Sequence, residues 1–498
     1  MARSLRDCLA DYPRVLLEAI AEGWHVPLTD EQLPEVVERL AAELTRREEV
    51  GRIVGLLNPQ EREALGAVAA REQTRSFVLI RQYGDIRRLG PGRLEWEAAW
   101  REPSSPLERL WFLGLVHREY GVDGDYHGEV LFVPSDLRQL LPPLPMQVAE
   151  FQVDEVPNPS RMVDQGDALA RDVFVVLSHV RNHRVRVAKG GLPASELKRI
   201  LPRLQSSAPA QRLLLLQRLC TVSGLLEEEE RHWKAASTAA EWLRDGSLLR
   251  QRTLFQNWMR DPDWDELCQV PTLRCETTGW RSDPTAARRT LVRFLGQCPV
   301  GAWLDPASLV KSIYQLDPDF ARPDGDYASW YIRDASTGQY LAGFGNWDRV
   351  EGAWLRYLLE GPLFWLGITA LGFGPAADRP HCIRLTSKGA GILGQVDLPE
   401  EAPRPMVVLA SLDVRAPWTA SWYDRFLLER LAQWKGEDAQ DVRYTLDREA
   451  LRRAADEGVQ ANQVHGFLRR VTGGRLPDKV TEAVRAWMAP SSAEVKPG

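Results

Sequence analysis

The sequence predicts a mostly helical chain with small β-hairpins, built from tandem winged-helix-like units and a C-terminal α/β module. Long stretches repeat apolar residues at the three- to four-residue spacing of an amphipathic helix, as Val36, Val37, Leu40 and Leu44 do. Short apolar runs separated by Gly- and Asp-rich turns follow several of these helices, and this pattern predicts hairpins. Pro-rich stretches divide the 498 residues into sections of domain size.

The first domain shows the winged-helix pattern most completely. Two predicted helices are followed by a third that begins at Ser105-Pro106, where a capping hydroxyl precedes a proline at the first helical position. A strand is expected over 115–120, and a turn-rich stretch leads into a second strand over 129–133. These two strands would form the hairpin, or wing, that such a domain carries after its third helix.

Helix starts and Pro-rich stretches also define the remaining sections of the chain. Helix starts are expected where a capping side chain stands before a helical pattern, at Asn58, Asp305 and Asp447. The predicted sections are an N-terminal helical segment (1–55), a winged-helix-like domain (56–145), a linker (146–165), a second helical or winged-helix-like domain (166–282), a third winged-helix-like domain (283–396) with an inserted segment (318–348), a C-terminal module (405–488) and a tail (489–498).

Composition restricts the environment and the partners. The formal net charge of −6 gives no global attraction to phosphate, so any contact with nucleic acid must come from a local basic patch. No run of about 18 apolar residues predicts a membrane span. The six cysteines are scattered without a CxxC pair, and the N-terminus lacks the apolar core of a secretory signal. We therefore expect a cytoplasmic protein with reduced thiols.

No motif in the sequence indicates catalysis, a metal or a cofactor. The phosphate-cradling GxxxxGK[ST] loop of an ATP-driven motor is missing. His179 and His183 have the i, i+4 spacing of metal ligands, but no third ligand stands nearby. The Asp-rich stretch 317–326 is explained by its prolines and glycine as turn chemistry. We expect a non-enzymatic protein without a small-molecule substrate.

Basic residues gather in the second predicted domain. The candidate DNA-binding residues are Arg181, Arg184, Arg186, Lys189, Lys198, Arg199 and Arg203. Their side chains could contact phosphates, or they could form a solvated charged face whose aliphatic stems cover the core. A second basic set, offset by acidic neighbours, is Arg443, Arg448, Arg452, Arg453, Arg469, Arg470 and Arg475. The first wing is acidic, and we therefore expect the first domain to bind protein or to be purely structural.

The 18 tryptophans leave two interpretations open. Many stand beside Leu and Phe in helical patterns, which favours large core residues at junctions between small domains. The alternative is a row of platforms on which the bases of a single strand stack.

The C-terminal module resembles helicase-associated proteins. The resemblance rests on Tyr444–Gly458, which reads YTLDREALRRAADEG, and on the stretches 464–470 and 476–480. The same module is similar to the N-terminal region of XPB-type helicases, in which it implies docking to a non-enzymatic partner subunit. Residues 323–334 and 361–367 resemble long prokaryotic members of that group.

Three functions remain open at this point. The resemblance favours a non-catalytic scaffold or adaptor that docks to a helicase or nuclease partner, with or without DNA. The alternative is a sequence-tolerant DNA-binding protein that acts in transcription or repair through its winged helices. An enzyme with an unrecognised site is the third, supported only by the Asp-rich segment.

Overall fold

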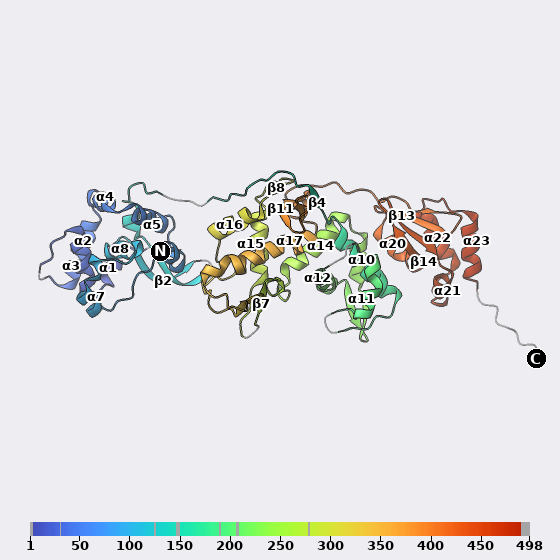
Figure 1. Ribbon diagram of the computed structural model, residues 1–498, viewed down its shortest axis with the longest axis horizontal. Coiled ribbons are helices and arrows are strands. Elements are labelled where there is room, and N and C mark those ends of the chain that lie inside the picture. The colour runs from blue at the N-terminus through green and yellow to red at the C-terminus, as the bar shows by residue number, and fades with distance from the viewer. Residues whose placement is uncertain are drawn as a thin grey trace, which may run out of the picture. The chain divides into compact units, whose positions relative to one another are not determined.

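The computed structural model confirms a mostly helical chain with small antiparallel sheets (Figure 1). It describes residues 3–29, 31–123, 126–145, 150–188, 191–205, 209–276 and 279–489. Contacts divide the chain into two compact units. Unit 1 comprises Met1–Glu150 with Arg322–Tyr327, and unit 2 comprises Phe151–Ala321 with Ala328–Gly498.

Unit 1 is a set of short helices around one small sheet. The helices are α1 (Leu5–Ala10), α2 (Arg14–Trp24), α3 (Leu33–Leu44), α4 (Arg47–Leu56), α5 (Pro59–Ala69), α6 (Ser76–Tyr83), α7 (Pro91–Glu97), α8 (Pro106–Phe112) and α9 (Ser135–Arg138). The sheet has the order β1-β3-β2, with β1 (Thr74–Arg75), β2 (His117–Asp123) and β3 (Tyr126–Phe132), and all its pairs are antiparallel. The predicted hairpin after the third helix is therefore present.

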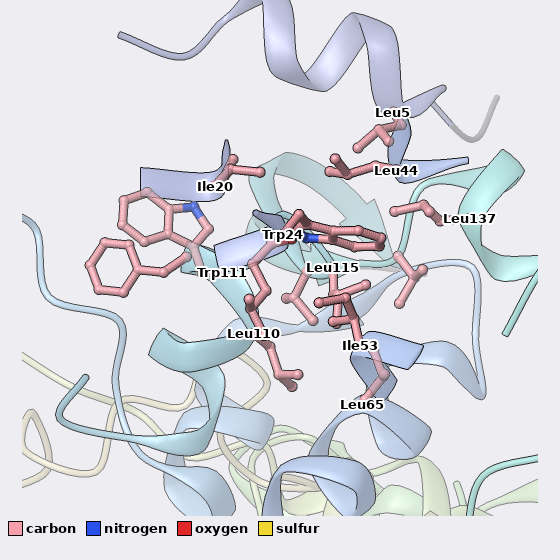
Figure 2. Packing of buried hydrophobic residues seen from close by; sticks show 14 of the residues in the cluster. Leu5, Ile20, Trp24, Leu44, Ile53, Leu65, Leu110, Trp111, Leu115 and Leu137 are labelled. Carbon is pink, nitrogen blue, oxygen red and sulfur yellow. Dashed lines mark hydrogen bonds between the residues drawn. The ribbon is translucent and has the colours of Figure 1, made fainter. Parts of the chain in front are cut away.

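The predicted N-terminal segment and the first domain share one hydrophobic core. Figure 2 shows members of this core from both sides of residue 56: Leu5, Ile20, Trp24, Leu44, Ile53, Leu65, Leu110, Trp111, Leu115 and Leu137. Trp24 joins the two parts by a hydrogen bond as well, since its indole Nε1 donates to the Leu113 carbonyl over 2.8 Å. Residues 1–55 are thus part of the same folded body as the domain that follows them.

The first half of unit 2 contains α10 (Ala168–Asn182), α11 (Ala194–Ile200), α12 (Ala210–Val222) and the hairpin β5 (Leu226–Glu229) and β6 (His232–Ala235). Residues 185–187 run along β6, since Val187 N donates to the Arg231 carbonyl and Trp233 N donates to the Val185 carbonyl. The elements of this part thus follow the order helix, short strand, helix, helix, hairpin. The helices α13 (Ser237–Arg244) and α14 (Ser247–Arg260) follow.

The sequence predicts a helical stretch from Trp233 onward, but the structure forms the β5–β6 hairpin over 226–235. The strand β5 carries a run of glutamates, a residue with low β-propensity. The turn residues Glu230 and Arg231 both have positive φ, 48° and 62°, without the Gly or Asn that usually marks such a turn. Sequence signals for this hairpin are therefore weak, and tertiary pairing decides its conformation.

The second half of unit 2 begins with α15 (Pro284–Leu295) and α16 (Pro306–Leu316) and continues with α17 (Ala353–Glu360), α18 (Pro362–Trp365) and α19 (Ser387–Ile392). Its sheet has the order β4-β10-β11-β8, formed by β4 (Arg161–Val163), β10 (Thr369–Phe373), β11 (Pro380–Leu385) and β8 (Trp303–Leu304). The strand β4 lies in the predicted linker 146–165. This segment is thus part of the third domain's sheet rather than a bare connection.

The predicted insertion 318–348 has contacts of its own. It contributes β9 (Ile332–Asp334), which pairs with β7 (Leu273–Cys275). The Trp330 indole stacks on that of Trp280, with 5.2 Å between ring centroids. Among the residues that the structure describes, no helix combines the length and the apolar character needed to cross a bilayer.

The C-terminal module is a four-stranded antiparallel sheet with helices. The sheet order is β12-β13-β15-β14, and the strands are β12 (Val407–Val408), β13 (Asp413–Pro417), β14 (Ala432–Glu437) and β15 (Asp441–Leu446). The helices are α20 (Trp422–Leu428), α21 (Arg448–Asp456), α22 (Ala461–Val471) and α23 (Asp478–Trp487). The spacing of apolar residues predicts a helix over 418–434. This prediction is wrong at both ends, because Trp418 follows β13 and Trp434 lies on β14, where cross-strand pairing overrides helical spacing.

Candidate nucleic-acid interface

The structure disperses the seven predicted DNA-binding residues. Arg181 lies in the last turn of α10, Lys198 and Arg199 lie on α11, and Arg203 ends the short 3-10 helix that follows α11. Arg184 and Arg186 lie on either side of Val185, at the start of the strand segment that borders β6. Lys189 lies outside the described residues.

Two of the seven side chains are used inside the protein. The Arg181 guanidinium lies over the Phe426 ring, 4.4 Å from its centroid, and burial lowers the pKa of this group. Arg203 Nη2 donates to Glu429 Oε1 over 2.6 Å, and the Glu429 carboxylate is almost completely buried. Both arginines therefore join α10 and its neighbour to the C-terminal module. They are positioned to hold two parts of unit 2 together rather than to meet a phosphate backbone.

The exposed members of the set are Arg184, Arg186, Lys198 and Arg199. Arg199 Nη1 pairs with the Glu196 carboxylate at 3.0 Å. The same carboxylate accepts from His179 Nε2 at 2.7 Å, and these two partners together lower the pKa of Glu196. The His179 and His183 rings lie close, with centroids 4.5 Å apart. The buried His179 imidazole is thus held by Glu196 of α11, and His183 packs against it.

An acidic hairpin lies directly beside the basic strand segment. Residues 227–230 are all glutamates, all exposed, and they form most of β5 and its turn. The backbone of Arg186 forms an isolated antiparallel β-bridge with the backbone of His232 on β6. The hairpin and the predicted basic patch are therefore neighbours in space. Glu229 pairs with Lys234 of β6 at 3.2 Å, and the other carboxylates of the hairpin weaken the attraction of the patch for phosphate. This feature went unnoticed in the sequence because the hairpin itself was not predicted.

The third helix of this unit, α12, does not offer its arginines to a ligand. In a winged helix the corresponding helix usually enters the DNA major groove. Arg212 is fully buried and its Nη1 contacts Asp172 Oδ2 at 2.5 Å. Arg218 Nε and Nη2 make a two-pronged contact with Asp261 at 2.6 and 2.5 Å. Both cations are therefore neutralised by carboxylates of the protein.

The second basic set forms a different surface, on the C-terminal module. Arg470 pairs with Asp424 at 2.8 Å. On α21 and α22, by contrast, several arginines are exposed and lie in no ion pair of the described residues: Arg448, Arg452, Arg453 and Arg469. We call these four the C-terminal arginine face. The two helices are joined by the short turn 457–460, as in a helix-turn-helix.

Nowhere in the described part of the chain do three or more His, Cys, Asp or Glu side chains gather as a metal site requires. In the Asp-rich stretch, Asp319 is buried and Asp317 is half-buried. Asp317 accepts from Arg293 at 2.5 Å, and Asp305 caps α16 through the Ala307 and Ser308 amides.

No protein-family model matches the chain, and no curated protein matches it.

Proposed function

We propose that this chain is a non-catalytic scaffold or adaptor that docks to a helicase or nuclease partner. The observation that supports it is the acidic β5–β6 hairpin beside the predicted DNA-binding patch. Together with the internal pairing of the α12 arginines, it leaves this winged-helix-like unit poorly suited to a phosphate backbone. Winged-helix folds whose grooves and wings are neutralised in this way are suited to contacts with protein.

The C-terminal module supplies the docking surface in this proposal. It is held on the rest of unit 2 by aromatic and charged contacts, among them the Arg203–Glu429 pair. The four side chains of the C-terminal arginine face are exposed and lie in no ion pair among the described residues. Such a face complements an acidic surface on a partner. The identity of that partner as a helicase or nuclease rests on the resemblance of this module to XPB-type helicases.

A crosslinking experiment tests the docking. The full-length tagged chain is crosslinked in its native lysate, and crosslinked peptides are identified by mass spectrometry. We expect an ATPase or nuclease joined to residues of α21–α23, and we expect this product to disappear in the variant Arg452→Glu, Arg453→Glu. A matched control is Arg260→Glu, which reverses an exposed charge at the end of α14. Crosslinks to partners of other classes alone would contradict the proposal.

Nucleic-acid binding is the second candidate function, and the C-terminal arginine face is the observation that favours it. Arginines on a helix-turn-helix arrangement could contact phosphates on both sides of a groove. Fluorescence anisotropy with duplex, forked and single-stranded DNA across a salt series distinguishes the two functions. Binding that weakens steeply with salt and is lost in Arg452→Glu, Arg453→Glu would support DNA as the ligand.

The same titration tests the original basic patch. We expect the variant Arg184→Glu, Arg186→Glu, Lys198→Glu to bind DNA as the wild type does, because the neighbouring glutamates already offset this patch. Loss of DNA binding in this variant alone would show that Arg184, Arg186 and Lys198 contribute to the DNA interface. Arg181 and Arg203 are left out of the variant, since their substitution would disturb internal contacts.

A further inference from the structure

A pocket of about 600 Å³ opens on unit 2 where the loop before α10, the start of α10, the end of β11 and the start of α19 meet. Its volume lies within the range of pockets that hold small molecules. Nothing in the sequence motifs indicated this pocket, because its walls come from segments more than two hundred residues apart.

The pocket gathers more positive than negative side chains. Its lining includes the cations Arg171, Arg384 and Lys388 and the carboxylates Asp164 and Asp167. Lys388 is already neutralised, since its Nζ contacts Asp167 Oδ1 and lies 3.1 Å from Ser247 Oγ. Asp164 accepts from the Gly166 amide at 2.8 Å. Arg171, Arg384 and Asp164 are therefore the charged groups of the lining that lie in no ion pair, which leaves a net positive charge.

Arg171 is a partly buried cation that lies in no ion pair, although the carboxylates of Asp167, Glu437 and Asp172 favour its charged form from nearby. Its guanidinium lies 3.8 Å from the centre of the Trp418 ring, and burial lowers the pKa of this group. One nitrogen, Nη1, donates to Gln205 Oε1 at 3.4 Å, while the buried Nε has no hydrogen-bond partner. A buried charge in this state is costly, and a bound anion would offset the cost.

Arg384 brings a second guanidinium to the same pocket. It extends from β11, lies 4.8 Å from the centre of the Trp303 ring, and approaches Met162 Sδ at 3.0 Å through Nη2. No carboxylate of the described chain forms an ion pair with it. The planar fork of an arginine matches the oxygens of a phosphate group, and two such forks match a dianion in charge.

We propose that this pocket binds a small phosphate-bearing molecule, whose phosphate group is held by Arg171 and Arg384. The volume exceeds that of a phosphate group alone, so the rest of the ligand occupies the part lined by Asp164 and Gln165. The Gln165 Oε1 atom is buried without a partner and can accept a hydrogen bond from a ligand hydroxyl or amine. Binding here does not depend on the docking proposed above.

Isothermal titration calorimetry of the full-length protein with inorganic phosphate and with AMP tests this site. We expect both to bind, with AMP tighter, and we expect Arg384→Gln to weaken both by about tenfold or more, because a charge-assisted hydrogen bond is lost. Arg485→Gln, at an exposed position on α23, is the matched control and should bind as the wild type does.

A second pair of variants keeps the test decisive if Arg384→Gln does not fold. Ser387 lines the pocket, is exposed, and begins α19, where an acidic residue suits the helix dipole. Ser387→Glu should therefore fold and repel phosphate, while the neutral Ser387→Gln should bind it. Equal binding by these two variants would overturn the site.

Two further ligands test whether the site prefers phosphate over carboxylate and a small molecule over a nucleic acid. Succinate, a carboxylate dianion, should bind more weakly than phosphate, and equal affinity would overturn the assignment to phosphate. A single-stranded oligonucleotide without terminal phosphates should not compete with AMP. If the oligonucleotide competes with AMP in the wild type but not in Arg384→Gln, the ligand of this site is a nucleic-acid backbone and the proposal of a small molecule is wrong.

Discussion

His117 in unit 1 lies in a chain of hydrogen bonds that fixes its protonation. Its Nε2 lies 2.9 Å from the Gly114 carbonyl, which can only accept, so Nε2 carries the hydrogen. Its Nδ1 therefore accepts from the Tyr12 hydroxyl at 2.7 Å, and this hydroxyl accepts from Trp111 Nε1 at 3.1 Å. The imidazole is buried and neutral, and burial lowers its pKa to about 4.

This buried imidazole predicts an acid-sensitive stability. In the unfolded chain a histidine has a pKa of about 6.5, so the unfolded state binds a proton that the folded state rejects between that pH and about pH 4. The contribution of His117 to the free energy of unfolding should be fully present above about pH 6.5. It should fall by about 3 kcal/mol as the pH falls from there through about pH 4. An NMR titration of the His117 ring measures the pKa, and urea unfolding of wild type and His117→Gln measures the loss. A His117 pKa near the unfolded value would contradict this expectation.

Arg288 and Glu266 form a fully buried ion pair in unit 2. Arg288 Nη2 lies 2.9 Å from Glu266 Oε2, and Arg288 Nη1 donates to the carbonyls of Trp258 and Asp261. Trp258 Nε1 donates to the same carboxylate at 2.6 Å. The pair thus ties the end of α14 to α15 with every polar group engaged, and removal of one partner would leave a charge in the core.

We expect Arg288→Met to lower the free energy of unfolding by about 3–5 kcal/mol, because it leaves the Glu266 carboxylate buried and unpaired. The neighbouring Arg289→Met is the control, since Arg289 is exposed and its pair with Asp283 at 3.5 Å is weak. This change should cost less than about 1 kcal/mol. Guanidinium unfolding of both variants measures the difference, and similar midpoints would contradict it.

At the scale of elements, helix starts follow their local residues. The predicted caps Asn58, Ser105, Asp305 and Asp447 are all confirmed, each accepting from an amide of the first turn. Gln460 stands where a Ser or Thr cap would suit the start of α22 better, but Gln463 Oε1 accepts from the Gln460 amide at 2.9 Å and supplies a cap from inside the helix. Short-range hydrogen bonds of this kind need only a few neighbouring residues, which is why the sequence predicts them well.

The β5–β6 turn is the element whose residues disagree with its conformation. Arg231 has a φ of 62°, a region in which a side chain is strained. Arg231→Gly should therefore raise the free energy of unfolding by about 1 kcal/mol. Glu229→Gly, in the adjacent strand, should lower it instead. Thermal unfolding followed by circular dichroism compares them, and destabilisation by the turn glycine would show that the Arg231 side chain stabilises the hairpin.

At the scale of the whole molecule, unit 2 is held together by aromatic side chains between its parts. Trp422 of the C-terminal module meets Phe174 of α10 edge-on, with centroids 5.7 Å apart, and Trp242 of α13 at 6.0 Å. The Arg250 guanidinium lies 4.0 Å from the centre of the Trp422 ring. These contacts favour the interpretation of the tryptophans as packing residues at junctions, at least for the ones in this part of the chain.

Trp422→Ala should loosen this junction. We expect a loss of about 3–5 kcal/mol in unfolding free energy and faster proteolytic cleavage in the connection 394–405, which has neither helix nor strand. Trp96→Ala is the control, since Trp96 is 85% exposed. Unchanged cleavage in Trp422→Ala would mean that the remaining contacts hold the C-terminal module by themselves.

The helical class, the first hairpin, the helix caps and the basic character of residues 181–203 can all be predicted from the amino-acid sequence. These properties depend on residue spacing and on neighbours within a few positions, so they can be predicted without knowledge of the fold. Which charged side chains remain free to contact a ligand depends on the tertiary structure. Arg181 and Arg203 contact a module more than two hundred residues away, the Glu-rich hairpin lies against Arg186, and the pocket of Arg171 and Arg384 joins distant segments. Electrostatic partners are set by distance in space, which the linear order of residues does not contain.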